Sequence, residues 1–191
     1  MPGSSLDSKK GIPILTALRK KIPPLDEILA VYGTIVFLIY GWASITFSWK
    51  VPSWLYYLSL AEITAILSYT LASSLLECTI ILLLLLLLAF LLPSKWLVDK
   101  FVTRASIIVY LLTFWVALFN LSTLIQLPTS RDLIFFGGIA ILTIGMAIVI
   151  ADRILPFQRL MTALGNRLIV FLYFWLPLSA LGILIILVRI L

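Results

Sequence analysis

Long apolar runs alternate with short polar segments along most of this chain. The runs are around twenty residues long, and a helix of that length crosses a hydrocarbon core of about 30 Å. Backbone groups inside lipid have no water to bond with, so these runs must be helical, and they lack the alternating pattern of barrel strands. The pattern predicts an all-α polytopic integral membrane protein with about five transmembrane helices. The expected spans are residues 26–48, 73–92, 102–126, 133–150 and 168–190.

Two shorter segments are expected to form helices in the membrane interface. Residues 53–67 precede the second span on the outer side. In residues 156–164, on the inner side, the apolar positions share one helical face, Pro156 suits the first turn and Gly165 suits a C-terminal cap. We therefore expect two short interfacial helices that are separate from the spans that follow them.

The polar residues in the middle of residues 52–92 leave open whether this stretch crosses the membrane once or twice. With one crossing, 11 of the 14 Lys and Arg residues lie on one side and three on the other; with two crossings the division is eight and six. Basic residues concentrate on the cytoplasmic side of membrane proteins. The charge distribution favours one crossing, with the N-terminus in the cytoplasm and the C-terminus outside.

The charge pattern also divides the chain into a tail and a membrane domain. Residues 1–25 are predicted to form a basic cytoplasmic tail near the lipid surface, and residues 26–191 a single helical membrane domain. The first apolar run is longer than the core of a cleavable signal peptide, so we expect it to be retained as a span. A prokaryotic cytoplasmic membrane is the simplest location.

Composition narrows the possible functions. The chain is 63% hydrophobic and 12% charged, about half the charged fraction of a soluble domain. Its net charge of +6 comes from clusters at the ends of apolar runs, whereas nucleic-acid binding needs basic residues gathered on one solvated face. With no histidine and a single cysteine, we expect no metal site, no bound cofactor and no catalytic residues. The expected partners are the bilayer and either another protein or further copies of the chain.

Glu77 is the most informative polar position. The apolar run after it is too short to span, so Glu77 is expected about 6–7 Å inside the outer hydrocarbon boundary. An ionisable side chain at such a depth is a functional hypothesis, although a hydrogen bond to a neighbouring helix would also explain it. Glu62, in contrast, is expected to be solvated on the outer interfacial helix. The candidate polar intramembrane site comprises Glu77, Asn120, Ser73, Ser74 and Gln126.

Three functions fit these observations. The first is a non-catalytic membrane component, that is, an accessory, assembly or anchoring subunit of a membrane complex. The second is a small transporter or channel protomer in which Glu77 faces a pathway. The third is a lipid-handling protein that uses the region of Glu77 and Asn120 as a headgroup pocket.

Overall fold

A computed structural model describes residues 23–93, 97–123 and 129–190 of the chain. In these residues the fold is entirely helical, and five helices are long and apolar enough to cross a membrane. This confirms the predicted fold class of a multi-pass integral membrane protein. A single 3₁₀ turn, η1 (Val98–Lys100), precedes α5. The five long helices are α2 (Leu25–Trp54), α3 (Leu60–Leu91), α5 (Phe101–Thr123), α6 (Ser130–Arg153) and α7 (Leu155–Ile190).

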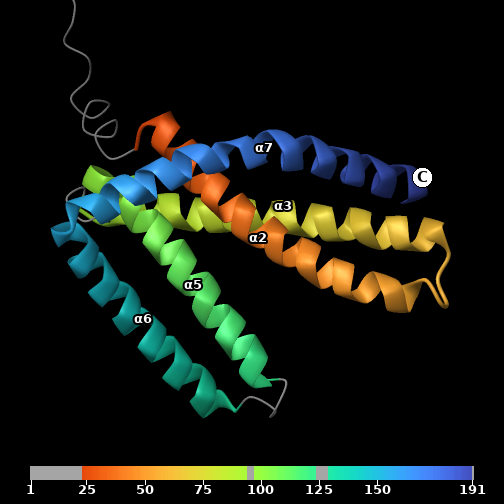
Figure 1. Cartoon of the computed structure of the whole chain (residues 1–191), viewed down its shortest axis with the longest axis horizontal. Helices are drawn as coiled ribbons and strands as arrows, with labels where there is room; N and C mark the ends of the chain where they lie inside the picture. Colours follow the sequence, from red (N-terminus) through yellow and green to blue (C-terminus); the bar gives the residue numbers. More distant parts are fainter. Residues whose placement is uncertain (1–22, 94–96, 124–128, 191) are drawn as a thin grey trace, which may run out of the picture.

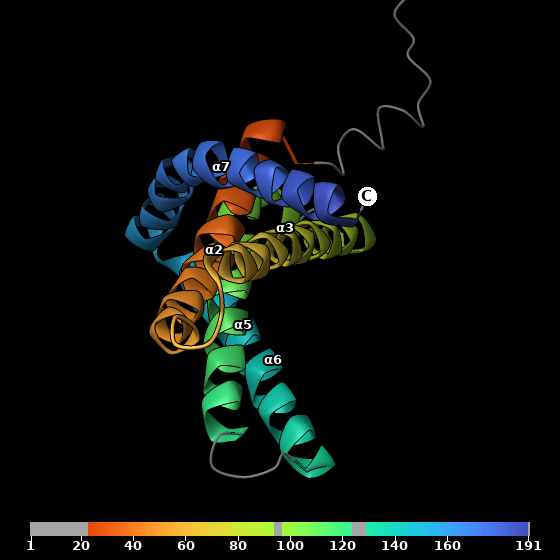
Figure 2. The same cartoon turned by 90° about the vertical axis from the view of Figure 1, so that its right-hand side faces the viewer.

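The helices form two groups. Helices α2, α3 and α7 pack side by side, and α5 and α6 form a hairpin that meets them at one end and diverges from them at the other (Figures 1 and 2). The two ends of the described chain lie at opposite ends of the bundle (Figure 1). This arrangement leaves the second half of α5 without cover from α2 and α3.

Tyr40 ties the three-helix group together. Its side chain is almost fully buried and stacks on the ring of Trp175 at a centroid distance of 4.8 Å. Its hydroxyl lies 2.6 Å from Ser179 Oγ on α7 and donates to the carbonyl of Leu71 on α3 at 3.3 Å. One side chain of α2 therefore joins both neighbouring helices inside an apolar core.

A glycine allows α2 and α7 to cross closely. A Cβ atom placed on Gly33 would lie 2.9 Å from backbone atoms of Leu168 and Ile169. The same addition to Gly41, about two turns further along α2, would meet no atom within 4 Å. Close approach of two backbones is the usual reason for a small residue at a helix crossing in membranes. Gly33 is thus the contact point between α2 and α7.

The first predicted interfacial helix, residues 53–67, does not exist as a separate element. Helix α2 continues to Trp54, and α3 begins at Leu60 and runs without a break through the polar middle of the stretch. Ser59 and Glu62 form a capping box that starts α3. The hydroxyls of Thr64, Ser68, Thr70 and Thr79 in α3 donate to carbonyls four residues earlier. Polar residues therefore do not interrupt the helix.

The second predicted interfacial helix, residues 156–164, is also continuous with the span that follows it. Helix α7 runs from Leu155 to Ile190 and passes through Gly165, which therefore caps nothing. Gly165 is buried, and a Cβ there would lie 3.3 Å from Ala30 on α2 and from Val102 on α5. This glycine permits close packing of helices. The sequence alone does not distinguish that role from a helix cap, because glycine suits both.

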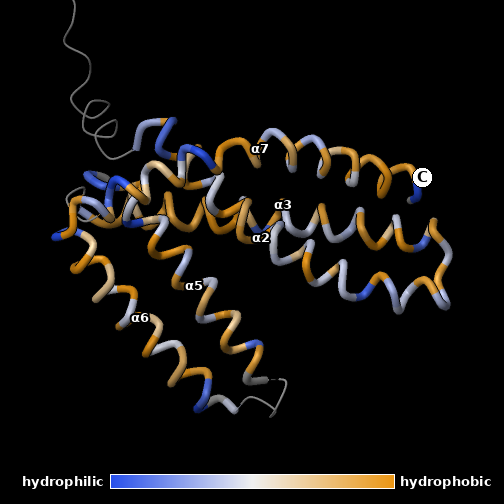
Figure 3. The backbone as a smooth tube through the Cα atoms, in the orientation of Figure 1, coloured by the Kyte–Doolittle hydropathy of each residue, from blue (hydrophilic) through white to orange (hydrophobic). Residues whose placement is uncertain are grey.

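Large apolar side chains are exposed on each of the five long helices. Hydrophobic positions follow most of the backbone, and the most hydrophilic ones lie mainly toward the helix ends (Figure 3). Helix α6 is the extreme case, since its most apolar 18-residue window contains no buried residue. Such a surface suits lipid. The end where the two helix groups meet carries most of the described basic residues, and we call it the basic end. Its basic residues are Lys100, Arg104, Arg153, Arg159 and Arg167.

Candidate functional site: a lateral cleft between α2, α3 and α5

A cleft of about 630 Å³ opens where α5 diverges from α2 and α3. Its walls are residues 38–46 of α2, 69–81 of α3 and 112–120 of α5. The first part of α5 is buried against the other helices, with Phe101 and Ala105 fully covered, whereas Val116 is mostly exposed. The divergence seen in Figures 1 and 2 therefore creates the cleft, and its volume is in the range of small-molecule sites.

The cleft brings together four of the five residues of the predicted polar site. Glu77, Ser73 and Ser74 line it from α3, and Asn120 lines it from α5. Ser73 Oγ donates a hydrogen bond of 3.2 Å to Glu77 Oε1. The fifth residue, Gln126, lies outside the described residues.

Glu77 is inside the hydrocarbon region wherever α3 sits in the membrane. Helix α3 has 32 residues, about 48 Å, whereas a span needs about 20 residues. Every 20-residue stretch within α3 contains residues 72–79, and so contains Glu77. A charged side chain there costs about 3 kcal/mol unless it meets water or polar groups. The polar lining of the cleft supplies such groups.

A second, almost wholly apolar hollow of about 260 Å³ continues the cleft toward the basic end. It is lined on α3 as far as Leu88, which lies 11 residues, about 16 Å, beyond Glu77. Aliphatic side chains of α2 and α5 complete it, among them Ile35 and Ile108. The two hollows share Ile39, Ile81, Leu112 and Thr113. Together they form a groove with a polar end and an apolar end.

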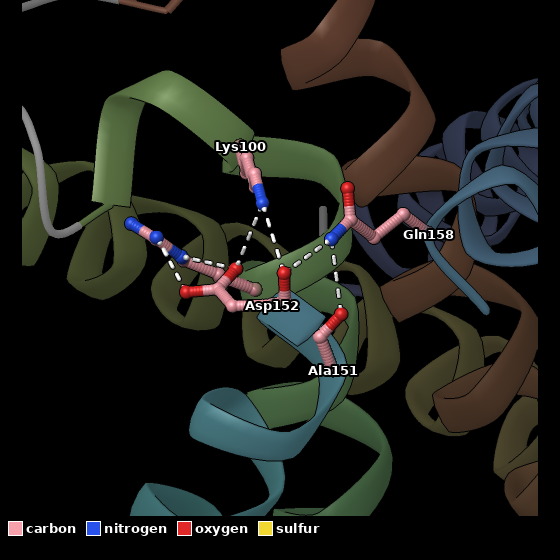
Figure 4. A network of polar contacts seen from close by, with 5 residues as sticks. Lys100, Ala151, Asp152 and Gln158 are labelled. Carbon is pink, nitrogen blue, oxygen red and sulfur yellow. Dashed lines mark hydrogen bonds and ion pairs between the residues drawn. The ribbon is translucent and has the colours of Figure 1, made fainter. Parts of the chain in front are cut away.

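An ion pair joins α5 to α6, the two helices of the hairpin, at the basic end. Arg104, largely buried on α5, donates from Nη2 to Asp152 Oδ2 at 2.6 Å and from Nε to Oδ1 at 3.3 Å. Lys100 and Gln158 donate to backbone carbonyls in the last turn of α6, where the helix dipole favours cations (Figure 4). This network fixes α6 to both α5 and the start of α7, while the opposite end of the hairpin stays apart.

Several residues of the groove and of this network were not anticipated from the sequence. Trp42 and Tyr69 line the cleft but look like ordinary aromatic residues in an apolar run. Asp152 offered a usable signal, because an acidic residue in the last turn of a helix is unfavourable unless a cation pairs with it. Glu62 is exposed at the start of α3 and lies outside the cleft.

Comparison of the chain with protein-family models, with curated proteins and with solved structures gave no match. Within the described residues, no group of three or more His, Cys, Asp or Glu side chains is placed to hold a metal ion.

Proposed function

We propose that this protein is a lipid-handling membrane protein that binds one amphiphile in the groove between α2, α3 and α5. The observation that supports the proposal is the continuity of the polar cleft around Glu77 with the apolar hollow that reaches Leu88. The distance of about 16 Å between these residues is half the hydrocarbon thickness, which is the length available to an acyl chain in one leaflet. The groove thus matches a headgroup joined to a chain.

The polar end of the groove favours a lipid over a transmembrane helix of another protein. A helix would place Glu77 in a dry interface unless it supplied a polar partner. A lipid headgroup brings its own polar groups to Glu77, and an acyl chain suits the apolar hollow.

The test blocks the apolar hollow and measures bound lipid. Leu84→Trp places a large ring in the hollow, whereas Leu87→Trp adds the same ring to an exposed position of α3 outside it. We expect native mass spectrometry of the purified full chain to show one bound lipid in the wild type and in Leu87→Trp, and at least tenfold less in Leu84→Trp. Equal lipid binding by the two variants, or no bound lipid in the wild type, would overturn the proposal.

An accessory role in a membrane complex is a second candidate function. Helix α6 supports it, because Gly137, Gly138 and Gly145 are exposed, and a Cβ atom added to any of them would meet no atom within 4 Å. The face of α6 turned away from α5 is therefore open to a partner. Purification from the native membrane distinguishes the two functions. A stoichiometric protein partner supports the accessory role, and a bound lipid supports the first proposal. The transporter function stays a prediction, tested by flux in proteoliposomes.

We also propose that the N-terminus faces the cytoplasm and the C-terminus the outside. The basic end carries five described basic residues, and Lys50, Arg131 and Arg189 lie at the opposite helix ends. This asymmetry has the sign of the positive-inside rule. Reporter fusions at the two termini test the orientation, and its reversal would leave the lipid site unchanged but exchange the leaflets. The prokaryotic cytoplasmic membrane stays a prediction.

A further inference from the structure

The lining of the cleft contains one carboxylate and no cation. Among the described residues that line it, Glu77 is the single charged side chain, and no Lys or Arg belongs to the lining. Lipid phosphates are normally held by arginine or lysine. A phosphate about 5 Å from Glu77 would be repelled strongly enough, at an effective dielectric constant of about 20, to weaken binding by roughly two orders of magnitude. The charge of the cleft therefore disfavours anionic lipids.

The hydrogen-bonding capacity of the cleft points in the same direction. Thr70 donates its hydroxyl proton to the carbonyl of Ile66, and Thr46 donates its own to carbonyls in α2. Ser73 donates to Glu77. Each of these three hydroxyls has already used its proton, so its oxygen can only accept from a ligand, as a carboxylate does. The lining also contains side chains with donor protons, namely Ser74, Trp42, Tyr69 and Asn120. The cleft therefore suits a ligand that both donates and accepts hydrogen bonds.

Aromatic rings complete the lining. Trp42 on α2 and Tyr69 on α3 both line the cleft, and each is about half exposed. Such rings offer an apolar face beside polar groups. Polar groups of both kinds are spread over three helices, next to two aromatic faces, and a sugar ring matches them because its hydroxyls both donate and accept. A phosphate group provides acceptors only.

We propose that the headgroup bound in the cleft is an uncharged, hydroxyl-bearing one, and that the ligand is a glycolipid in which a sugar is joined to acyl chains without a phosphate. Glu77, Ser73, Thr70 and Thr46 accept hydrogen bonds from the sugar hydroxyls, and the chains occupy the apolar hollow. This inference rests on the proposed function, since it names the class of lipid that the groove selects.

The experiment compares headgroups on one set of acyl chains. The purified full chain is placed in nanodiscs of a neutral matrix lipid, and native mass spectrometry measures binding of glucosyl-diacylglycerol, phosphatidylethanolamine and phosphatidylglycerol. We expect the glucosyl lipid to bind at least tenfold more tightly than phosphatidylglycerol. Phosphatidylethanolamine should bind with intermediate affinity, because its ammonium group can pair with Glu77 while its phosphate meets no cation in the lining. Equal binding of all three lipids, or preference for either phospholipid, overturns this inference but leaves the proposed function intact. No binding of any lipid overturns both.

Glu77→Gln tests the stated role of the carboxylate. The substitution keeps the shape of the side chain and removes its charge, so the discrimination against phosphatidylglycerol should fall at least tenfold, while binding through the acyl chains persists. Glu62 is an exposed carboxylate on the same helix but outside the cleft. Glu62→Gln is therefore the matched control and should retain the full discrimination against phosphatidylglycerol. Unchanged discrimination in Glu77→Gln would overturn the assignment. Protection of the buried Cys78 thiol verifies that both variants fold.

Discussion

Gly33 lies where α2 crosses α7, and replacing it with alanine tests whether this crossing sets the stability of the three-helix group. The added Cβ would lie 2.9 Å from three backbone atoms of Leu168 and Ile169, whereas ordinary contacts of a Cβ atom begin at 3.4 Å. Backbone atoms cannot rotate away as a flexible side chain can. The two helices must therefore separate by about 0.5 Å at this point.

The cost of this separation follows from the packing it loosens. A buried side chain makes about 50 contacts worth roughly 0.15 kcal/mol each, and a gap of 0.5 Å forfeits about a quarter of each affected contact. If about a third of the contacts of two neighbouring side chains cross the interface, the loss is about 1 kcal/mol. Overpacking strain of about 1–3 kcal/mol adds to it. We expect Gly33→Ala to lower the free energy of unfolding by at least about 2 kcal/mol.

The single cysteine provides the assay. Cys78 is fully buried in the same hydrophobic cluster as Val31 and Ile35 of α2, so a thiol reagent reaches it only after the helices separate. In mixed micelles, 2 kcal/mol corresponds to a labelling rate about 30 times that of the wild type. Gly41→Ala, on the same helix with no atom within 4 Å, should label at nearly the wild-type rate. Equal rates for the two alanine variants would refute the reasoning.

Two further substitutions test the polar contacts between helices. Tyr40→Phe leaves the buried hydroxyl of Ser179 without its 2.6 Å partner, so we expect a loss of about 1 kcal/mol and roughly fivefold faster labelling of the cysteine. Ser179→Ala combined with Tyr40→Phe should cost no more than Tyr40→Phe alone, and additive costs would show that the contact between the two hydroxyls contributes nothing. Asp152→Asn removes the charge that pairs with Arg104, so amide hydrogen exchange in the last turn of α6 should rise about tenfold. An unchanged exchange rate would show that this ion pair does not stabilise the end of α6.

The sequence determined the fold class because lipid removes the alternatives. A run of about twenty apolar residues can only be a helix in a bilayer, so the pattern of apolar runs and the distribution of basic residues together predicted the number of spans. The helix ends were less predictable. Gly165 has the sequence signature of a cap, but its role depends on how closely Ala30 approaches, and that is a property of the packed helices.

The candidate site shows the same division. The cost of placing Glu77 in lipid is a local property of the chain, so the sequence alone identifies this residue as a candidate. The groove around it depends on the divergence of α5 from α2 and α3, because only the first part of α5 is buried against the other helices. The sequence around an aromatic residue such as Trp42 does not indicate that its ring lines a cleft. Only the tertiary structure decided which polar and apolar side chains share one groove, because helix crossing angles depend on contacts between residues far apart in the sequence.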